Sequence, residues 1–304
     1  MGKLLVILGP TGVGKTALCL RLAEQWECPI VSADSRQIYR NIPIGTAAPT
    51  LEERQRVPHY FIGTHSLSED YNAGQYERDC IKQLTQLHSQ HQKDTPFAIL
   101  TGGSMLYPDF ICNGLDHLPP TDTQIRSLLQ REYETNGLAW LQQEVQEADP
   151  DYWANVDQYN PQRLIHCLEI CRTTGRRYSE LRTHPTVSRP WKTIKIGLTR
   201  PRKQLYERIN QRVETMIQNG LLEEVQRVSQ WRDKNSLNTV GYKELFRYMD
   251  GELTLDEAVA LIKQDSRHYA KRQMTWWRRD TEIHWIDAAQ TFEEIKYNID
   301  QLIS

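Results

Sequence analysis

Apolar and polar positions alternate in two different ways along the 304-residue chain, and the first part reads as strands separated by helices. Three short apolar runs, Leu4–Leu8, Pro29–Asp34 and Phe97–Leu100, predict strands within residues 1–112. Strands that alternate with helical patterns are typical of a parallel sheet with helices on its faces. We therefore expect an α/β fold, a parallel sheet flanked by helices, for this part of the chain.

From about residue 118 the apolar positions recur with a helical period. The helices predicted in this middle part are Thr123–Glu134, Leu138–Glu147 and Gln162–Thr173. A later apolar run, Ile194–Thr199, predicts a strand that rejoins the sheet. The remainder reads as helical, over Lys203–Asn219, Leu221–Trp231, Tyr242–Met249 and Leu255–Arg278. We expect a core made of residues 1–114 and 194–304, with a helical insertion at 115–193.

A glycine-rich loop directly follows the first apolar run and reads G-P-T-G-V-G-K-T, the G-x-x-x-x-G-K-T pattern of a P-loop. Its glycines let backbone N–H groups turn toward phosphate oxygens, and the helix behind it adds the positive end of its dipole. Lys15 adds a mobile positive charge, and Thr16 adds a hydroxyl ligand for a phosphate-bound Mg²⁺. The loop therefore predicts a P-loop core that binds a pyrophosphate group through Gly9, Pro10, Thr11, Gly12, Val13, Gly14, Lys15 and Thr16.

One acidic residue is well placed near this loop. Asp34 ends a predicted strand, and the strands of a doubly wound parallel sheet end at the edge where ligands bind. The strand Phe97–Leu100 is followed instead by Thr101–Ser104, which offers hydroxyls and glycines but no carboxylate. On spacing alone, Asp34 also fits the magnesium ligand of a P-loop small-molecule kinase.

Composition limits the class of protein. With 39% hydrophobic and 25% charged residues, the chain is typical of a soluble globular protein. The six cysteines are scattered, and Cys167 and Cys171 have a helical spacing without a second pair for zinc, so we expect reduced thiols and a cytoplasmic protein. No apolar stretch approaches membrane length, so we expect no membrane partner.

The formal net charge of −2 hides a strong segregation of charge. Residues 115–157 hold nine acidic and two basic side chains, whereas residues 161–203 hold eleven basic and two acidic ones. Residues 263–279 add six basic side chains against one acidic. Two such basic stripes predict binding of a polyanion along its backbone, although each stripe alone is as typical of a solvated helix face.

Six further motifs follow the glycine-rich loop, namely Ser32–Tyr39, Ile44–Ala47, Gly102–Tyr107, Asn160–Arg163, Gly241–Glu244 and Tyr269–Trp276. In this order they resemble the motifs of the tRNA dimethylallyltransferases, also called tRNA isopentenyltransferases. The resemblance implies a P-loop core and a helical insertion that clasps the anticodon stem-loop of tRNA. It also implies transfer of a dimethylallyl group from dimethylallyl diphosphate to N6 of adenosine 37 in tRNAs that read U-initial codons.

The resemblance implies roles for individual residues as well. Asp34 is expected to accept the proton of the adenine amine, Lys15 to neutralise the leaving diphosphate, and the Ser104 hydroxyl to lie at the reaction chamber. Arg208 is the expected diphosphate clamp, with Arg200 and Arg212 as alternatives. The expected tRNA-binding residues are Asp34, Ser35, Arg36, Gln37, Ser104, Arg126, Gln162, Arg163, Leu164, Ile165, His166, Lys271, Arg272 and Gln273. We expect the enzyme to act as a monomer.

The chain departs from the family pattern at several positions. Gly12 and Val13 replace a usual Ala-Ser, Ala48 replaces a lysine, residues 61–67 replace an acidic stretch, and His166 stands where a second arginine is expected. A neutral imidazole is a weaker phosphate partner than a guanidinium group. Two other functions are compatible with the residues: prenylation of a free adenine nucleotide, and a P-loop protein that binds RNA as a kinase or a non-catalytic chaperone.

Overall fold

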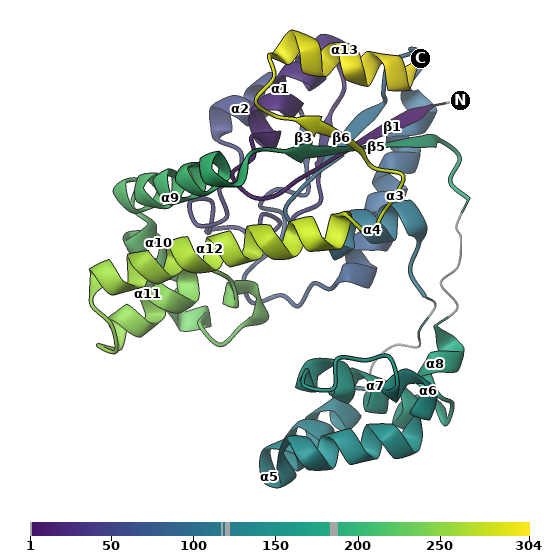
Figure 1. Ribbon diagram of the computed structural model, residues 1–304, viewed down its shortest axis with the longest axis vertical. Helices are drawn as coiled ribbons and strands as arrows, with labels where there is room; N and C mark the ends of the chain where they lie inside the picture. Colours follow the sequence, from purple (N-terminus) through teal and green to yellow (C-terminus); the bar gives the residue numbers. More distant parts are fainter. Residues whose placement is uncertain (1, 117, 119–121, 183–187) are drawn as a thin grey trace. The chain divides into compact units, whose positions relative to one another are not determined.

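The structure, a computed structural model, describes residues 2–116, 118, 122–182 and 188–304 (Figure 1). The chain forms two compact units. We call residues 1–112 and 188–304 the core unit, and residues 113–187 the insertion unit. None of the helices in the described ranges has the length and apolar character that crossing a lipid bilayer requires.

The core unit is built on a six-stranded sheet with the strand order β3-β2-β4-β1-β5-β6. The strands are β1 (Lys3–Leu8), β2 (Ile30–Ser32), β3 (His59–Tyr60), β4 (Ala98–Thr101), β5 (Lys192–Thr199) and β6 (His284–Asp287). Every pairing between neighbouring strands of the described chain is parallel. The carboxyl ends of the strands therefore meet at one edge, which is where ligands bind in folds of this kind.

Helices cover this sheet and make up the insertion unit. The helices that precede the insertion unit are α1 (Lys15–Trp26), α2 (Leu51–Arg56), α3 (Ala73–Gln90) and α4 (Leu106–Asn113). The last residue of α4, Asn113, is the first residue of the insertion unit. Those of the insertion unit are α5 (Thr123–Ala148), α6 (Pro150–Trp153), α7 (Pro161–Thr174) and α8 (Tyr178–Leu181). Those after it are α9 (Arg202–Gln218), α10 (Leu221–Val228), the 3₁₀ helices η1 (Ser229–Trp231) and η2 (Asn235–Leu237), α11 (Tyr242–Met249), α12 (Leu255–Trp277) and α13 (Phe292–Ile303).

Strand β1 illustrates why the strands read as continuous apolar runs. Leu5 and Ile7 pack with α1 and α13 on one face of the sheet, whereas Leu4 and Val6 pack with α3 and α4 on the other. Figure 1 shows α1 and α13 together on one side of the sheet. Successive side chains of a strand point to opposite faces, so a strand that is covered on both faces is apolar throughout.

A third apolar cluster packs α10, α11 and α12 against the segment that follows Asp34. Within it, the fully buried Glu224 accepts hydrogen bonds from the N–H groups of Ile44 (2.9 Å) and Gly45 (2.8 Å) and from the hydroxyl of Tyr242 (2.6 Å). A Cβ on Gly45 would lie 2.5 Å from the Tyr242 hydroxyl oxygen, so only glycine fits there. The Ile44–Ala47 and Gly241–Glu244 motifs therefore pack against each other, through Gly45 and Tyr242.

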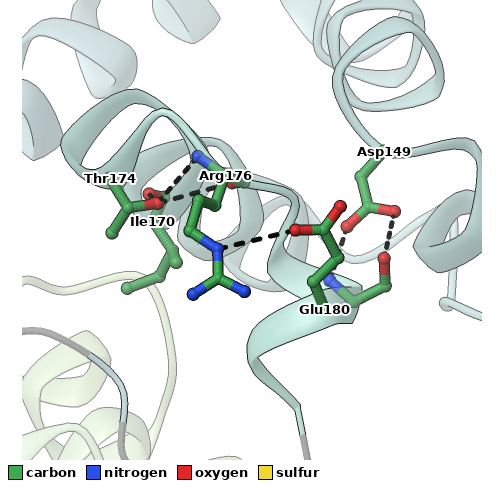
Figure 2. Close-up of polar contacts among 6 residues, drawn as sticks. Asp149, Ile170, Thr174, Arg176 and Glu180 are labelled. Atoms are coloured by element: carbon green, nitrogen blue, oxygen red, sulfur yellow. Dashed lines mark hydrogen bonds and ion pairs between the residues drawn. The ribbon is translucent and has the colours of Figure 1, made fainter.

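The insertion unit has an apolar core of its own, formed by α5, α6, α7 and α8. Gly137 has non-helical dihedral angles (φ 78°, ψ −174°) within α5, so the two helices expected from the sequence meet at this residue. The turn between α7 and α8 is closed by Thr174, whose hydroxyl donates to the Ile170 carbonyl (2.7 Å) and accepts from the Arg176 N–H (3.1 Å). Figure 2 shows these contacts together with the ion pair between Arg176 and Glu180 of α8.

The expected α/β core with a helical insertion is confirmed, but details differ from the sequence prediction. Strand β5 begins at Lys192, because Lys192 and Thr193 pair with Lys3 and Leu4, so the predicted end of the insertion at residue 193 lies too far along the chain. The C-terminal part is not helical throughout, since β6 follows α12 and pairs with β5. Strand β3 has two residues, too few for a periodic signal.

Candidate active site

A cavity of about 1240 Å³ opens at the carboxyl edge of the sheet in the core unit. Its lining comes from the glycine-rich loop after β1, the segment after β2, the turn after β4, and helices α9 and α12. The sequence-predicted residues that line it are Thr11, Gly12, Gly14, Lys15, Thr16, Asp34, Ser35, Arg36, Gln37, Arg208, Arg272 and Gln273, together with the alternative Arg212. The fold thus brings the loop and the well-placed acid into one cavity.

The backbone of the glycine-rich loop explains its sequence. Gly9, Gly12 and Gly14 have φ values of 144°, 79° and 116°, in a region that favours glycine. A Cβ on Gly12 would also lie 2.9 Å from a side-chain carbon of Ile209, and one on Gly9 would lie 2.8 Å from the Leu198 carbonyl oxygen. The loop is therefore held between β5 and α9 in its present shape.

Lys15 lies across this loop and donates hydrogen bonds from Nζ to the carbonyl oxygens of Gly9 (2.6 Å) and Pro10 (3.1 Å). Burial, and then the neighbouring charge of Arg212, lower the pKa of the Lys15 ammonium from 10.5 to about 8, although the Asp34 carboxylate opposes this shift. An anion bound at the loop favours the charged form, because an opposite charge nearby stabilises an ammonium group. Lys15 is thus well suited to bind phosphate below pH 8.

Two arginines of α9 line the same cavity. Arg208 donates from Nε to the carbonyl oxygen of Gly12 (2.8 Å), which holds its guanidinium group against the loop. Burial lowers the pKa of Arg212, and the charge of Asp34 opposes that shift. Arg200, the other alternative clamp, donates to the Ala288 carbonyl and is not among the residues that line this cavity. Of the three arginines predicted as candidates, Arg208 and Arg212 therefore line the cavity and Arg200 does not.

The Asp34 carboxylate is oriented by three backbone N–H groups. Oδ1 accepts from Arg36 (2.9 Å) and Gln37 (3.3 Å), and Oδ2 accepts from Gly103 (3.1 Å). Among the residues that the structure describes, Gly103 alone donates to Oδ2, and a carboxylate oxygen has two lone pairs, so one lone pair is left for a further donor. The arrangement presents an oriented proton acceptor to the cavity.

Ser104 and Gln37 have internal partners. The buried Ser104 hydroxyl accepts the N–H of Ser35 (2.8 Å) and is not among the cavity-lining groups, so it supports the Asp34–Ser35 segment from behind. The Gln37 amide accepts from the Ser32 hydroxyl (3.1 Å) and donates to the carbonyl oxygens of Thr46 (3.2 Å) and Ala47 (3.2 Å). Both side chains therefore take part in hydrogen bonds that hold the segment after β2 in place.

The side chains of Val13 and Gln273 are both fully buried. The Val13 side chain is fully buried in the apolar core. A phosphate bound at the loop would therefore meet the backbone of Val13 and not its side chain. Gln273 is also fully buried, whereas its neighbours Lys271 and Arg272 are exposed. A helix places consecutive residues on different faces, and for this reason Gln273 does not belong to the basic surface of α12.

In the insertion unit the expected RNA-binding residues separate into two groups. Gln162 and Arg163 are exposed, whereas the side chains of Leu164 and Ile165 are buried in the core and do not form part of the surface that Gln162 and Arg163 present.

The other two expected residues of this unit share one partner. Arg126 (Nη1, 3.1 Å) and His166 (Nδ1, 3.5 Å) both contact Oε2 of Glu169, whose side chain has no exposed surface. The side chains of Arg126 and His166 are partly exposed. Glu169 is therefore a buried anchor beneath two surface residues.

A separate cluster in the same unit consists of Asp149, Cys167 and Cys171, whose potential ligand atoms lie within 4.8 Å of one another. The thiol–thiol hydrogen bond lowers the pKa of Cys171 to about 7 and raises that of Cys167. The buried Asp149 carboxylate already accepts hydrogen bonds from the Tyr152 N–H (3.0 Å) and from the N–H and hydroxyl of Ser179 (both 2.7 Å). We interpret the cluster as a helix junction that joins α6, α7 and α8.

Comparisons with known proteins place these observations in context. The IPP transferase family model matches residues 37–280. The chain is 53% identical to tRNA dimethylallyltransferase 1 of Phocaeicola vulgatus, over 97% of each chain, and 51% identical to tRNA dimethylallyltransferase 1 of Bacteroides thetaiotaomicron, over 98% of this chain and 95% of the relative. A solved tRNA isopentenylpyrophosphate transferase from Bacillus halodurans is 32% identical, with a TM-score of 0.72 over 100% of this chain and 97% of that one.

Sequence reasoning missed one contribution of α12. Tyr269 and Gln273 both donate to the carbonyl oxygen of Gly103, each at 2.7 Å. They are four residues apart, a spacing that places two side chains on one helix face. The four-residue spacing of Tyr269 and Gln273 within the Tyr269–Trp276 motif is the sequence signal that predicts a shared helix face.

Proposed function

The chain belongs to the IPP transferase family, and on that premise we propose that it transfers a dimethylallyl group from dimethylallyl diphosphate to N6 of adenosine 37 in tRNAs that read U-initial codons. One observation carries the proposal. The phosphate-binding loop and the oriented Asp34 carboxylate line the same cavity, so a diphosphate donor and a proton acceptor meet there.

The donor is proposed to bind with its diphosphate in the glycine-rich loop. Lys15, Arg208 and Arg212 supply positive charge where the leaving group becomes more negative, and charge that is already in place stabilises the transition state. Thr16 is exposed and lines the cavity, so its hydroxyl fits the single protein ligand that Mg²⁺ often takes beside phosphate oxygens and water. When bound, Mg²⁺ adds charge neutralisation at the diphosphate.

The transfer itself exchanges one bond for another. The bond between the allylic carbon and the diphosphate oxygen breaks, and its electron pair leaves with pyrophosphate. A bond forms between that carbon and N6 of the adenine, and an N6 proton moves to Oδ2 of Asp34. Because the lone pair of N6 is delocalised into the ring, a positioned carboxylate is needed both to orient and to activate the amine. Adenosine 37 has to leave its stack to reach this carboxylate.

The tRNA is proposed to contact both units. In the core unit, Ser35 and Arg36 lie beside Asp34 in the cavity, and Lys271 and Arg272 form the exposed basic surface of α12. In the insertion unit the surface candidates are Gln162, Arg163, Arg126 and His166. Arginine and lysine contacts of this kind position an RNA backbone without reading its sequence. The names of the curated relatives support tRNA as acceptor over a free adenylate or a kinase substrate.

Radiolabelled dimethylallyl diphosphate, Mg²⁺ and the full chain test the proposal in three parallel reactions. The acceptors are unmodified tRNA that reads U-initial codons, the same tRNA with guanosine at position 37, and AMP; a fourth reaction measures ATP turnover. We expect label only in the first tRNA. Label in AMP would instead identify an adenylate prenyltransferase, and ATP turnover without prenyl transfer would identify a kinase.

A further inference from the structure

Gln273 connects the two halves of the active site through a buried amide. Its Oε1 accepts the N–H of Thr11 in the glycine-rich loop at 2.8 Å, and its Nε2 donates to the carbonyl oxygen of Gly103 at 2.7 Å. The side chain has no exposed surface. Because a buried polar group that loses its partner destabilises the fold by about 1–3 kcal/mol, both ends of this amide hold their partners firmly.

Gly103 carries this connection on to Asp34. Its N–H donates to Oδ2 of Asp34 at 3.1 Å, and its carbonyl oxygen accepts from both Gln273 and Tyr269. A Cβ at this position would lie 2.7 Å from the same Oδ2, so the backbone approaches the carboxylate as closely as only glycine allows. The location of Gly103 therefore constrains Oδ2, the oxygen proposed to accept the proton.

We propose that Gln273 is a positioning residue that sets the Asp34 carboxylate at the correct distance from a diphosphate held in the glycine-rich loop. The inference rests on the proposed function, because it takes Asp34 as the proton acceptor and the loop as the donor site. Gln273 reaches the reacting atoms only through Thr11 and Gly103. Its effect is geometric: a displacement of about 1 Å between reacting groups lowers a rate by about 10²-fold.

The amide of Gln273 supplies both groups that its partners need. Thr11 offers an N–H and needs an acceptor, whereas Gly103 offers a carbonyl oxygen and needs a donor. Methionine has a similar length and neither group, so Gln273→Met removes both bonds while filling the space. Glutamate keeps the acceptor for Thr11 and loses the donor for Gly103, so Gln273→Glu breaks only the half of the connection that leads to Asp34.

The test uses the full chain in single-turnover transfer at saturating dimethylallyl diphosphate and tRNA. For Gln273→Met we expect the rate constant to fall about 10- to 100-fold, with the KM for the donor and the Kd for tRNA within about threefold of wild type. Met274→Leu, the neighbouring position of α12, is the matched control and should retain the wild-type rate. A normal rate for Gln273→Met, or a loss confined to binding, would overturn the proposal.

A double-mutant cycle with Gly103→Ala separates positioning from a general structural role. Both changes act on the same carboxylate, so we expect the combined loss of rate to be clearly smaller than the product of the two single losses. Independent, multiplicative losses would mean that Gln273 does not act through Gly103.

If Gln273→Met fails to fold, as judged by circular dichroism, Gln273→Glu takes its place, and a wild-type rate for that variant would overturn the inference. Failure of the proposed function is distinguishable, since wild-type protein would then not transfer label to tRNA.

Discussion

The two units hold their candidate functional groups in different ways. In the core unit, the Asp34 carboxylate is oriented by three backbone N–H groups. In the insertion unit, Arg126 and His166 are partly exposed side chains that share one oxygen of the buried Glu169. The second oxygen of Glu169 has no hydrogen-bond partner among the residues that the structure describes. Backbone N–H groups thus orient the proposed proton acceptor, whereas a side-chain carboxylate orients Arg126 and His166, the proposed RNA contacts of the insertion unit.

This difference suits the two tasks. A proton acceptor has to be held within about 0.5 Å of its productive position, so its support has to be rigid. Contacts to an RNA backbone tolerate adjustment, because phosphate groups are recognised mainly by charge. We therefore expect substitutions in the core unit to change the rate of transfer, and substitutions on the RNA-binding surfaces to change affinity with little effect on the rate of the bound complex.

The largest effect is expected for Asp34→Ala, which removes the proton acceptor. The single-turnover rate should fall by about 10²–10⁴-fold, the usual contribution of a general base, while the Kd for tRNA stays within a few fold. Asp94→Ala, at an exposed position distant in sequence from the site, is the control for loss of a carboxylate. A near-normal rate for Asp34→Ala would remove Asp34 from the chemistry and erase the contrast between the units.

The next largest effect concerns Lys15 and pH. The pKa of Lys15 is lowered to about 8, so its positive charge is present below that pH and is lost as the pH rises through it. If only the charged form binds the diphosphate, the KM for dimethylallyl diphosphate should therefore rise by about 25-fold between pH 7.5 and 9.5. Lys15→Arg keeps a charge at every pH in this range and should give a flatter profile. Equal profiles for the two proteins would mean that Lys15 does not hold the diphosphate through its charge.

A smaller effect is expected for Glu169→Gln in the insertion unit. The substitution keeps the shape of the side chain but removes the charge that anchors Arg126 and His166. The Kd for an anticodon stem-loop should rise about three- to tenfold, with an unchanged rate at saturating RNA. Glu180→Gln is the matched control, because Glu180 is exposed and forms a 3.6 Å ion pair with the exposed Arg176 (Figure 2). A loss of rate without a loss of affinity would show that the insertion unit supports the chemistry directly.

The smallest effect at physiological salt is expected for the double substitution Lys271→Ala and Arg272→Ala on α12. If these residues neutralise two phosphates, the slope of log Kd against log salt should decrease by about 2. Lys82→Ala, an exposed lysine on α3, should leave the slope unchanged. A slope that does not change in the double variant would exclude this surface from the RNA interface.

The sequence was informative where backbone conformation depends on residue type. The glycines of the loop and the apolar run before Asp34 predict the cavity, because positive φ values and strand ends leave a local signature, although β2 itself ends at Ser32. It was less informative about the direction in which side chains point. Val13 and Gln273 lie within recognisable motifs, yet both are buried, since their direction depends on tertiary packing that no local pattern encodes. The partners of Gln273, Thr11 and Gly103, lie 262 and 170 residues away.

The central claim is that Asp34 faces the prenyl donor and the amine of the flipped adenine within one cavity. A crystal structure of the full chain with an anticodon stem-loop and a thio-analogue of dimethylallyl diphosphate measures this directly. The analogue stays intact in the crystal because its thiodiphosphate is a slow leaving group. The account predicts the analogue's diphosphate on the glycine-rich loop and an Asp34 carboxylate oxygen within about 2.6–3.2 Å of N6 of adenosine 37. A diphosphate bound elsewhere, or a carboxylate turned away from N6, would contradict it.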